Sequence, residues 1–238
     1  MSGKLYVVGV GPGDPELLTL KGLRVLKEVP CIFVPKGREE GSSLALSIAS
    51  KITDLSGKEI IEAYFPMRKT RGLSGQCDLD TKWHETIETV LSRLRTGVDA
   101  AFITMGDPTV YSTFCYLHER LLDLAPDIVI EIVPGVSSIT ASAARAGIYL
   151  GIANERIAIL PANYDDSLKE VLLQFDTVVL MKVHKVFISI LRTLEDMQLL
   201  DKAIYVARAG MEDERIIPNI KEVKEEDINY FSVVIVRK

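Results

Sequence analysis

The loop Met105–Pro108 follows a mostly apolar run, Val98–Thr104, and holds the residues best suited to chemistry in this chain. Gly106 lets a ligand approach the backbone closely, Asp107 supplies a carboxylate, and Pro108 fixes φ and donates no hydrogen bond. One interpretation is an ordinary helix start, with Asp107 as the N-cap. The other is a strand–loop–helix junction that binds a ligand at the carboxyl edge of an open α/β sheet.

The elements around this loop favour the ligand-binding interpretation. The first half of the chain shows an apolar run, a short loop and a helical pattern five times in succession. This repetition predicts a parallel sheet with right-handed crossovers. In such a sheet every strand-to-helix loop lies at the same edge, and here those loops are residues 9–14, 35–42, 66–80, 105–109 and 134–138.

That edge would also gather a group of basic residues: Lys36, Arg38, Arg68, Lys69 and Arg71. The chain as a whole carries a formal net charge of −5. A concentration of cations in an acidic protein indicates an anionic ligand. The alternative is that these are ordinary solvated charges on loops. Taken by itself, Arg71 would be interpreted in this second way.

The first loop, Gly9–Asp14, is similar to a dinucleotide-binding fingerprint. Its third glycine is misplaced and Pro12 interrupts it, so we do not expect an NAD site. Asp14 followed by Pro15 predicts the start of a helix that reaches about Glu28. The helical period places a row of leucines on its buried side: Leu17, Leu20, Leu23 and Leu26.

The pattern changes after about Gly135, where strands outnumber helices. Strands are predicted at 156–160, 177–181, 203–207, 215–217 and 230–236. This succession indicates a mixed sheet. We therefore expect two α/β domains, residues 1–136 with a parallel five-stranded sheet and residues 137–238 with a mixed sheet.

Composition argues against several classes of protein. The net charge of −5 gives no reason to expect nucleic-acid binding, and no run of 18 apolar residues predicts a membrane span. The first residues show no signal-peptide pattern. The cysteines (Cys31, Cys77, Cys115) are widely spaced and the histidines (His84, His118, His184) lack metal-ligand spacing. We expect a cytoplasmic protein without a metal site.

Four loops, in this order, resemble those of the tetrapyrrole methyltransferases: VGVGPGD (Val8–Asp14), GDPTVY (Gly106–Tyr111), PGVSS (Pro134–Ser138) and MK (Met181–Lys182). The resemblance spans about residues 4–236. Members of this family use S-adenosyl-L-methionine in corrin and sirohaem synthesis and are commonly dimeric. The resemblance implies a class III methyltransferase-like fold of two α/β domains, with the cofactor in the cleft between them, and a homodimer.

The resemblance also implies a set of cofactor contacts: Pro12, Met105, Gly106, Asp107, Val110, Ser137, Ser138, Met181, Ala209 and Gly210. Many of these would be backbone contacts, which suits loops rich in glycine and proline. The basic residues are not part of the family pattern. They fit the implied substrate because a tetrapyrrole carries many carboxylates, which arginine binds well.

Within the family, the chain most resembles the precorrin-2 and cobalt-factor II C20-methyltransferases. The segments behind this likeness are VPKG (Val34–Gly37), FPM (Phe65–Met67) and GDPTVYST (Gly106–Thr113). The uroporphyrinogen branch usually continues its GDP loop with Phe-Gly-Arg, which is absent here. The alternatives are methylation at C11 or C17, a diphthamide-type protein methyltransferase, and an S-adenosylmethionine-binding protein without catalysis.

Methyl transfer from a sulfonium needs no enzyme nucleophile, because the donor is already activated. The enzyme positions the two reactants and excludes water. A base must finally take the proton of the methylated meso carbon. Asp107 and Lys182 follow predicted strands at the ligand edge, so they are the candidates for catalytic contact with the substrate.

Overall fold

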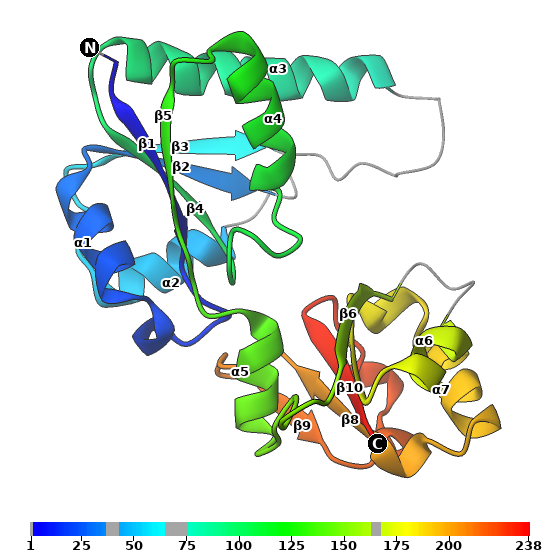
Figure 1. Ribbon diagram of the computed structural model, residues 1–238. Helices are drawn as coiled ribbons and strands as arrows, with labels where there is room; N and C mark the ends of the chain where they lie inside the picture. The colour runs from blue at the N-terminus through cyan, green and yellow to red at the C-terminus, as the bar shows by residue number, and fades with distance from the viewer. Residues whose placement is uncertain (1, 37–42, 65–75, 163–167) are drawn as a thin grey trace. The chain divides into compact units, whose positions relative to one another are not determined.

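The computed structural model describes residues 2–36, 43–64, 76–162 and 168–238 (Figure 1). It divides into two compact units, Met1–Val136 and Ser137–Lys238. Each unit is built around its own five-stranded sheet.

The first unit alternates strands and helices along the chain. Its elements are β1 (Lys4–Gly9), α1 (Leu20–Glu28), β2 (Cys31–Lys36), α2 (Leu44–Ile52), β3 (Glu59–Tyr64), α3 (Gln76–Arg95), β4 (Ala100–Thr104), α4 (Phe114–Leu124) and β5 (Val129–Val133). The strand order is β3-β2-β4-β1-β5, and every neighbouring pair is parallel. The predicted parallel sheet is therefore confirmed.

Helices cover both faces of this sheet. Alternate residues of β4 serve opposite faces: Phe102 packs with α3 and α4, whereas Ile103 packs with α1 and α2. Figure 1 shows the two helix pairs on opposite sides of the strands. Because both faces are apolar and buried, polar groups that serve a ligand belong at the sheet's carboxyl edge.

The second unit contains α5 (Ser138–Arg145), β6 (Ile157–Pro161), α6 (Leu168–Gln174), β7 (Thr177–Met181), α7 (Phe187–Asp196), β8 (Ala203–Ala207), β9 (Arg215–Ile217) and β10 (Ser232–Arg237). Its strand order is β6-β7-β10-β8-β9. Only β6 and β7 run parallel, and the other neighbouring pairs are antiparallel. The predicted mixed sheet is confirmed.

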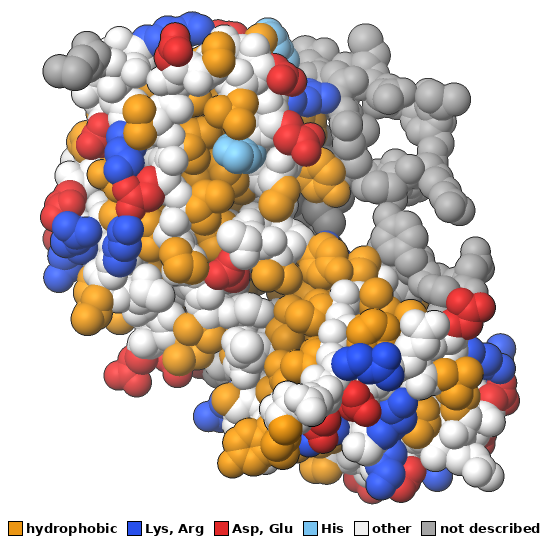
Figure 2. Space-filling model, viewed as in Figure 1, with side chains coloured by type: hydrophobic (Ala, Val, Ile, Leu, Met, Phe, Trp, Pro, Cys, Tyr) orange, Lys and Arg blue, Asp and Glu red, His pale blue; other side chains and the backbone are white. Residues whose placement is uncertain are grey.

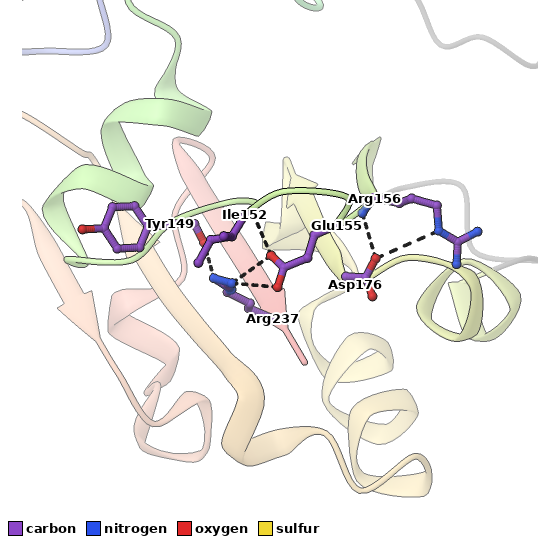
Figure 3. A network of polar contacts seen from close by, with 6 residues as sticks. All are labelled: Tyr149, Ile152, Glu155, Arg156, Asp176 and Arg237. Carbon is purple, nitrogen blue, oxygen red and sulfur yellow. Dashed lines mark hydrogen bonds and ion pairs between the residues drawn. The ribbon is translucent and has the colours of Figure 1, made fainter.

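A polar network fastens the connection between α5 and β6 to this sheet (Figure 3). Arg237, the last residue of β10, donates to the carbonyl of Tyr149 at 2.9 Å and to the Glu155 carboxylate at 2.8 and 3.1 Å. The backbone N–H of Arg156 donates to Asp176 at 2.7 Å. The long connection is thereby fixed where β6 begins beside β7.

The helix predicted to follow Asp14 without a break is wrong in its first part. The chain forms a short 3-10 helix, Pro15–Leu17, and α1 begins only behind a second N-cap, Thr19. Leu20 is 85% exposed, whereas Leu18 is buried. The break occurs because Thr19 caps a new helix and the turn before it directs Leu18, rather than Leu20, into the core.

The predicted loop 66–80 is wrong in its last part. Residues 66–75 lie outside the described part of the chain, and α3 already begins at Gln76. The apolar period that predicted this helix starts only at Trp83. No Gly or Pro occurs between Gln76 and Arg95, so nothing prevents the helix from extending towards its N-terminus.

Candidate functional site

The loop after β4 lies at the carboxyl edge of the sheet and does not itself begin a helix. The helix α4 begins only at Phe114, and Tyr111 within the loop has a positive φ of 50°. The Asp107 carboxylate accepts from the backbone N–H of Thr109 at 2.7 Å and from that of Gly135 at 3.0 Å. The interpretation of Asp107 as an ordinary N-cap is therefore wrong, because its side chain links the loops after β4 and β5.

Glycines allow the ends of β1, β4 and β5 to touch through their backbones. A Cβ on Gly135 would lie 2.2 Å from the carbonyl oxygen of Gly106, and a Cβ on Gly9 would lie 2.5 Å from the same atom. Gly106 N–H donates to the Gly11 carbonyl at 2.8 Å. Only residues without a side chain fit this arrangement, so main-chain groups converge at this edge.

The structure brings the first unit's predicted cofactor residues together on two adjoining loops. Pro12 follows Gly11, which forms an isolated bridge with Gly106. The remaining predicted residues belong to the loop that contains Gly106: Met105, Asp107 and Val110. Their use by a cofactor stays a prediction.

Lys36 is the member of the predicted basic group that lies within the described residues. It is the last residue of β2 and forms an ion pair with Glu62 on β3, and its side chain is only 16% exposed. Its charge is thus compensated locally, which reduces its attraction for an anion. The other members, Arg38, Arg68, Lys69 and Arg71, lie outside the described residues.

In the second unit, two predicted cofactor residues open α5. The hydroxyl of Ser137 accepts from the backbone N–H of Ile139 at 3.0 Å, which makes Ser137 the N-cap. Ser138 is the first helical residue. The Ser137 hydroxyl therefore orders the start of the helix, and any contact with a ligand would be additional.

The end of β7 carries a strained residue. Met181 is the last residue of the strand, and Lys182 adopts the left-handed conformation with φ 59° and ψ 39°. Nearby, the His184 ring packs edge-on against Tyr230 with a centroid separation of 5.2 Å. Burial lowers the pKa of His184. Strain of this kind in a non-glycine residue is typical of functional loops.

The loop after β8 contains Ala209 and Gly210 and is held by residues that sequence reasoning missed. Gly210 N–H donates to the Glu214 carboxylate at 2.7 Å, and Arg145 donates to the same carboxylate. Arg145 and Glu214 are 69 positions apart, and neither belongs to a recognisable motif. No sequence signal distinguishes this pair from ordinary surface charges.

Metal-binding clusters and membrane spans are both absent from the described residues. No group of three or more His, Cys, Asp or Glu side chains there is placed to hold a metal ion. Within the same ranges, no helix is long and apolar enough to cross a membrane.

Comparison with known sequences identifies relatives over the full chain. The chain is 38% identical to a probable cobalt-precorrin-2 C(20)-methyltransferase of Methanocaldococcus jannaschii, with 99% of this chain and 96% of the relative covered. It is 33% identical to the cobalt-precorrin-2 C(20)-methyltransferase of Salmonella typhimurium, with 100% and 98% covered. Both matches therefore extend over nearly the whole length of this chain and of the relative.

The fold agrees with that of solved structures. The uroporphyrin-III C-methyltransferase of Thermus thermophilus, solved with S-adenyl homocysteine, superposes with a TM-score of 0.68. It is 24% identical, and the match covers 99% of this chain and 98% of that one. The model of the family Tetrapyrrole (Corrin/Porphyrin) Methylases matches residues 4–224. The chain therefore belongs to the tetrapyrrole methylase family and has its class III methyltransferase fold.

Proposed function

We propose that this protein is an S-adenosyl-L-methionine-dependent C-methyltransferase that adds a methyl group to C20 of precorrin-2 or cobalt-factor II in cobalamin (vitamin B12) biosynthesis. The observation that carries the proposal is the full-length similarity to two proteins named as C20-methyltransferases. The match covers 96% of one relative and 98% of the other, so it extends over nearly the whole of both.

The proposed cofactor residues are those of the strand-end loops: Pro12, Met105, Gly106, Asp107, Val110, Ser137, Ser138, Met181, Ala209 and Gly210. The composition of these loops is compatible with the proposed donor. Gly9 and Gly135 pack against the Gly106 carbonyl without side chains between them, so the strand-end loops bring main-chain N–H and C=O groups together at this edge. When bound, S-adenosylmethionine supplies an activated methyl group.

The residues of the chain then bind and orient the two reactants and keep water out. Asp107 is proposed to contact the reactants, although three of its acceptor positions are already used by Thr109 N–H, Thr109 O–H and Gly135 N–H. A carboxylate has about four such positions, so roughly one remains. Lys182, held in a left-handed conformation, is the second proposed catalytic contact.

The proposed substrate is an anionic tetrapyrrole. Its carboxylates are proposed to bind Lys36, Arg38, Arg68, Lys69 and Arg71. Because Lys36 is paired with Glu62, the other four basic residues are proposed to provide most of this attraction. We propose no nucleic-acid or membrane partner and a cytoplasmic location, in keeping with the free thiols of Cys31 and Cys115.

We further propose that the protein is a homodimer. The second unit exposes several large apolar side chains before and within β6: Tyr149, Ile152, Ile157 and Ile159. Figure 2 shows hydrophobic side chains in orange on one face of the molecule. Tyr149 is 74% exposed, although Arg237 holds its backbone carbonyl (Figure 3). A rigid backbone with exposed apolar side chains suits an interface. Sedimentation velocity would test this state, and a single monomeric species would contradict it.

The proposed reaction is tested by supplying purified protein and S-adenosylmethionine with cobalt-factor II or with metal-free precorrin-2. Mass spectrometry then counts the methyl groups added to each. One added methyl supports methyltransferase activity, and its occurrence in only one tube defines the metal preference. Cofactor binding without methylation of either tetrapyrrole would overturn the proposal and favour a protein substrate or a non-catalytic role.

A further inference from the structure

The loop Arg208–Glu214 between β8 and β9 has an unfavourable backbone. Arg208 has a φ of 54° and Gly210 a φ of 76°, so two of three successive residues are left-handed. Arg208 N–H donates to the carbonyl of Phe231 at 2.7 Å, and Met211 N–H donates to that of Arg208 at 2.9 Å. Because a left-handed conformation is costly for arginine, surrounding contacts must hold the loop in place.

The Glu214 carboxylate binds the middle of this loop through a backbone hydrogen bond. It accepts the Gly210 N–H at 2.7 Å. The Nε of Arg145 lies 2.8 and 3.0 Å from its two oxygens, and the Nη2 of Arg145 lies 2.7 Å from one of them. The Glu214 side chain is only 11% exposed. These are charge-assisted hydrogen bonds, which are shorter and stronger than neutral ones.

Through Arg145 the same carboxylate is joined to α5. Arg145 is the last residue of that helix, which begins at Ser137 and Ser138. Glu214 thus connects two segments of the second unit that carry proposed cofactor contacts, the helix α5 and the loop with Ala209 and Gly210. Burial would raise the pKa of Glu214, but the hydrogen bonds from Arg145 and Gly210 lower it below its usual value.

The neighbouring carboxylate of Asp213 is placed differently. Asp213 pairs with the Nε of Arg208 and is 62% exposed. Exposed pairs of this kind contribute little. Glu214, by contrast, is nearly buried and accepts a backbone N–H from a proposed cofactor residue.

We infer that Glu214 is a positioning residue that fixes the Ala209–Gly210 backbone for S-adenosylmethionine, with Arg145 holding its carboxylate in place. The inference rests on the proposed function and deepens it. Glu214 would not touch the reacting atoms. Its contribution would be to keep the loop in its binding conformation before the ligand arrives, which lowers the entropic cost of binding.

The test measures binding of S-adenosylhomocysteine to the full chain by calorimetry, at a temperature where every variant is folded. Glu214→Ala leaves the Gly210 N–H without an acceptor, so binding should weaken roughly tenfold. Glu214→Gln keeps an amide oxygen for that N–H and should retain more affinity than Glu214→Ala. Glu226→Gln is the matched control, because Glu226 is exposed and pairs only loosely with Lys224 at 3.9 Å.

Kinetics provides a readout that a merely structural role would not move. The KM for S-adenosylmethionine should rise in Glu214→Ala while kcat at saturation stays unchanged, because the loop positions the ligand and not the chemistry. Equal affinity of wild type and Glu214→Ala would overturn the inference while leaving the proposed function intact. If Glu214→Gln lost as much affinity for S-adenosylhomocysteine as Glu214→Ala, the role assigned to the Gly210 hydrogen bond would be overturned. A wild-type chain that binds no S-adenosylhomocysteine would overturn the proposed function itself.

Discussion

Replacing Gly135 by alanine should break the contact between the ends of β1, β4 and β5. The new Cβ would lie 2.2 Å from the carbonyl oxygen of Gly106 and 2.9 Å from the Cα of Gly9. Ordinary van der Waals contact begins near 3.4 Å, so the backbones must separate by about 1 Å. Gly135 does not have a positive φ, and the effect is therefore steric and not conformational.

The expected cost is the energy of opening a contact made only of backbone. Forced insertion of a methyl group into a packed site costs about 1–3 kcal/mol, and neither neighbour here is a flexible side chain. The separation would also stretch the 3.0 Å hydrogen bond from Gly135 N–H to Asp107. We therefore expect Gly135→Ala to lower the free energy of unfolding by about 3 kcal/mol.

Urea unfolding followed by circular dichroism measures this difference. Gly57→Ala is the control, because Gly57 has a φ of +80° but a Cβ added there would meet no atom within 4 Å. It should lose only about 1 kcal/mol, from backbone strain. If Gly135→Ala were no more destabilised than Gly57→Ala, the argument for close backbone contact at this edge would be refuted.

Three further predictions follow from named contacts. Asp107→Asn should weaken S-adenosylhomocysteine binding roughly fivefold by calorimetry, and unchanged affinity would contradict this. Both oxygens of Asp107 accept a backbone N–H, so the NH2 group of asparagine would face the N–H of either Thr109 or Gly135. Lys21 and Lys4 lower the pKa of Glu131 from 4.5 to about 2, so this carboxylate stabilises the fold above pH 4.5 and loses that effect as pH falls towards 2. Urea unfolding of wild type and Glu131→Gln should therefore converge at low pH, and a constant difference would disprove the coupling. Burial lowers the pKa of His184 from 6.5, so the contribution of its neutral form to stability is complete above pH 6.5 and falls at lower pH. Below pH 6.5 the Tm of His184→Gln should therefore change less with pH than the Tm of wild type, and parallel plots of Tm against pH would argue against this effect.

Several elements could be predicted from the sequence because their signals are local. Thr177–Met181 and Ala203–Ala207 are apolar runs bounded by polar residues, and both strands have these bounds in the structure. The start of α1 could not be predicted in the same way. Asp14 and Thr19 are both good N-cap residues, and the choice between them depends on which leucine reaches the core.

The candidate site also has parts that the sequence predicts and parts that it does not. Glycine and proline mark the strand-end loops in the sequence, so the loops around Gly11 and Gly106 could be found without the structure. The contacts that hold such loops could not, because Asp107 and Gly135 are 28 positions apart. The Arg145–Glu214 pair is more distant still, and ion pairs across such separations leave no periodic pattern to detect.

The most direct test of the proposed function locates the transferred methyl group. S-adenosylmethionine labelled with ¹³C in its methyl group would be incubated with the protein and each tetrapyrrole, and the product analysed by NMR. We expect a single labelled methyl on C20. A label at C11, C17 or another carbon would contradict the C20 assignment while keeping the family, and no label in either tetrapyrrole would contradict the proposed reaction altogether.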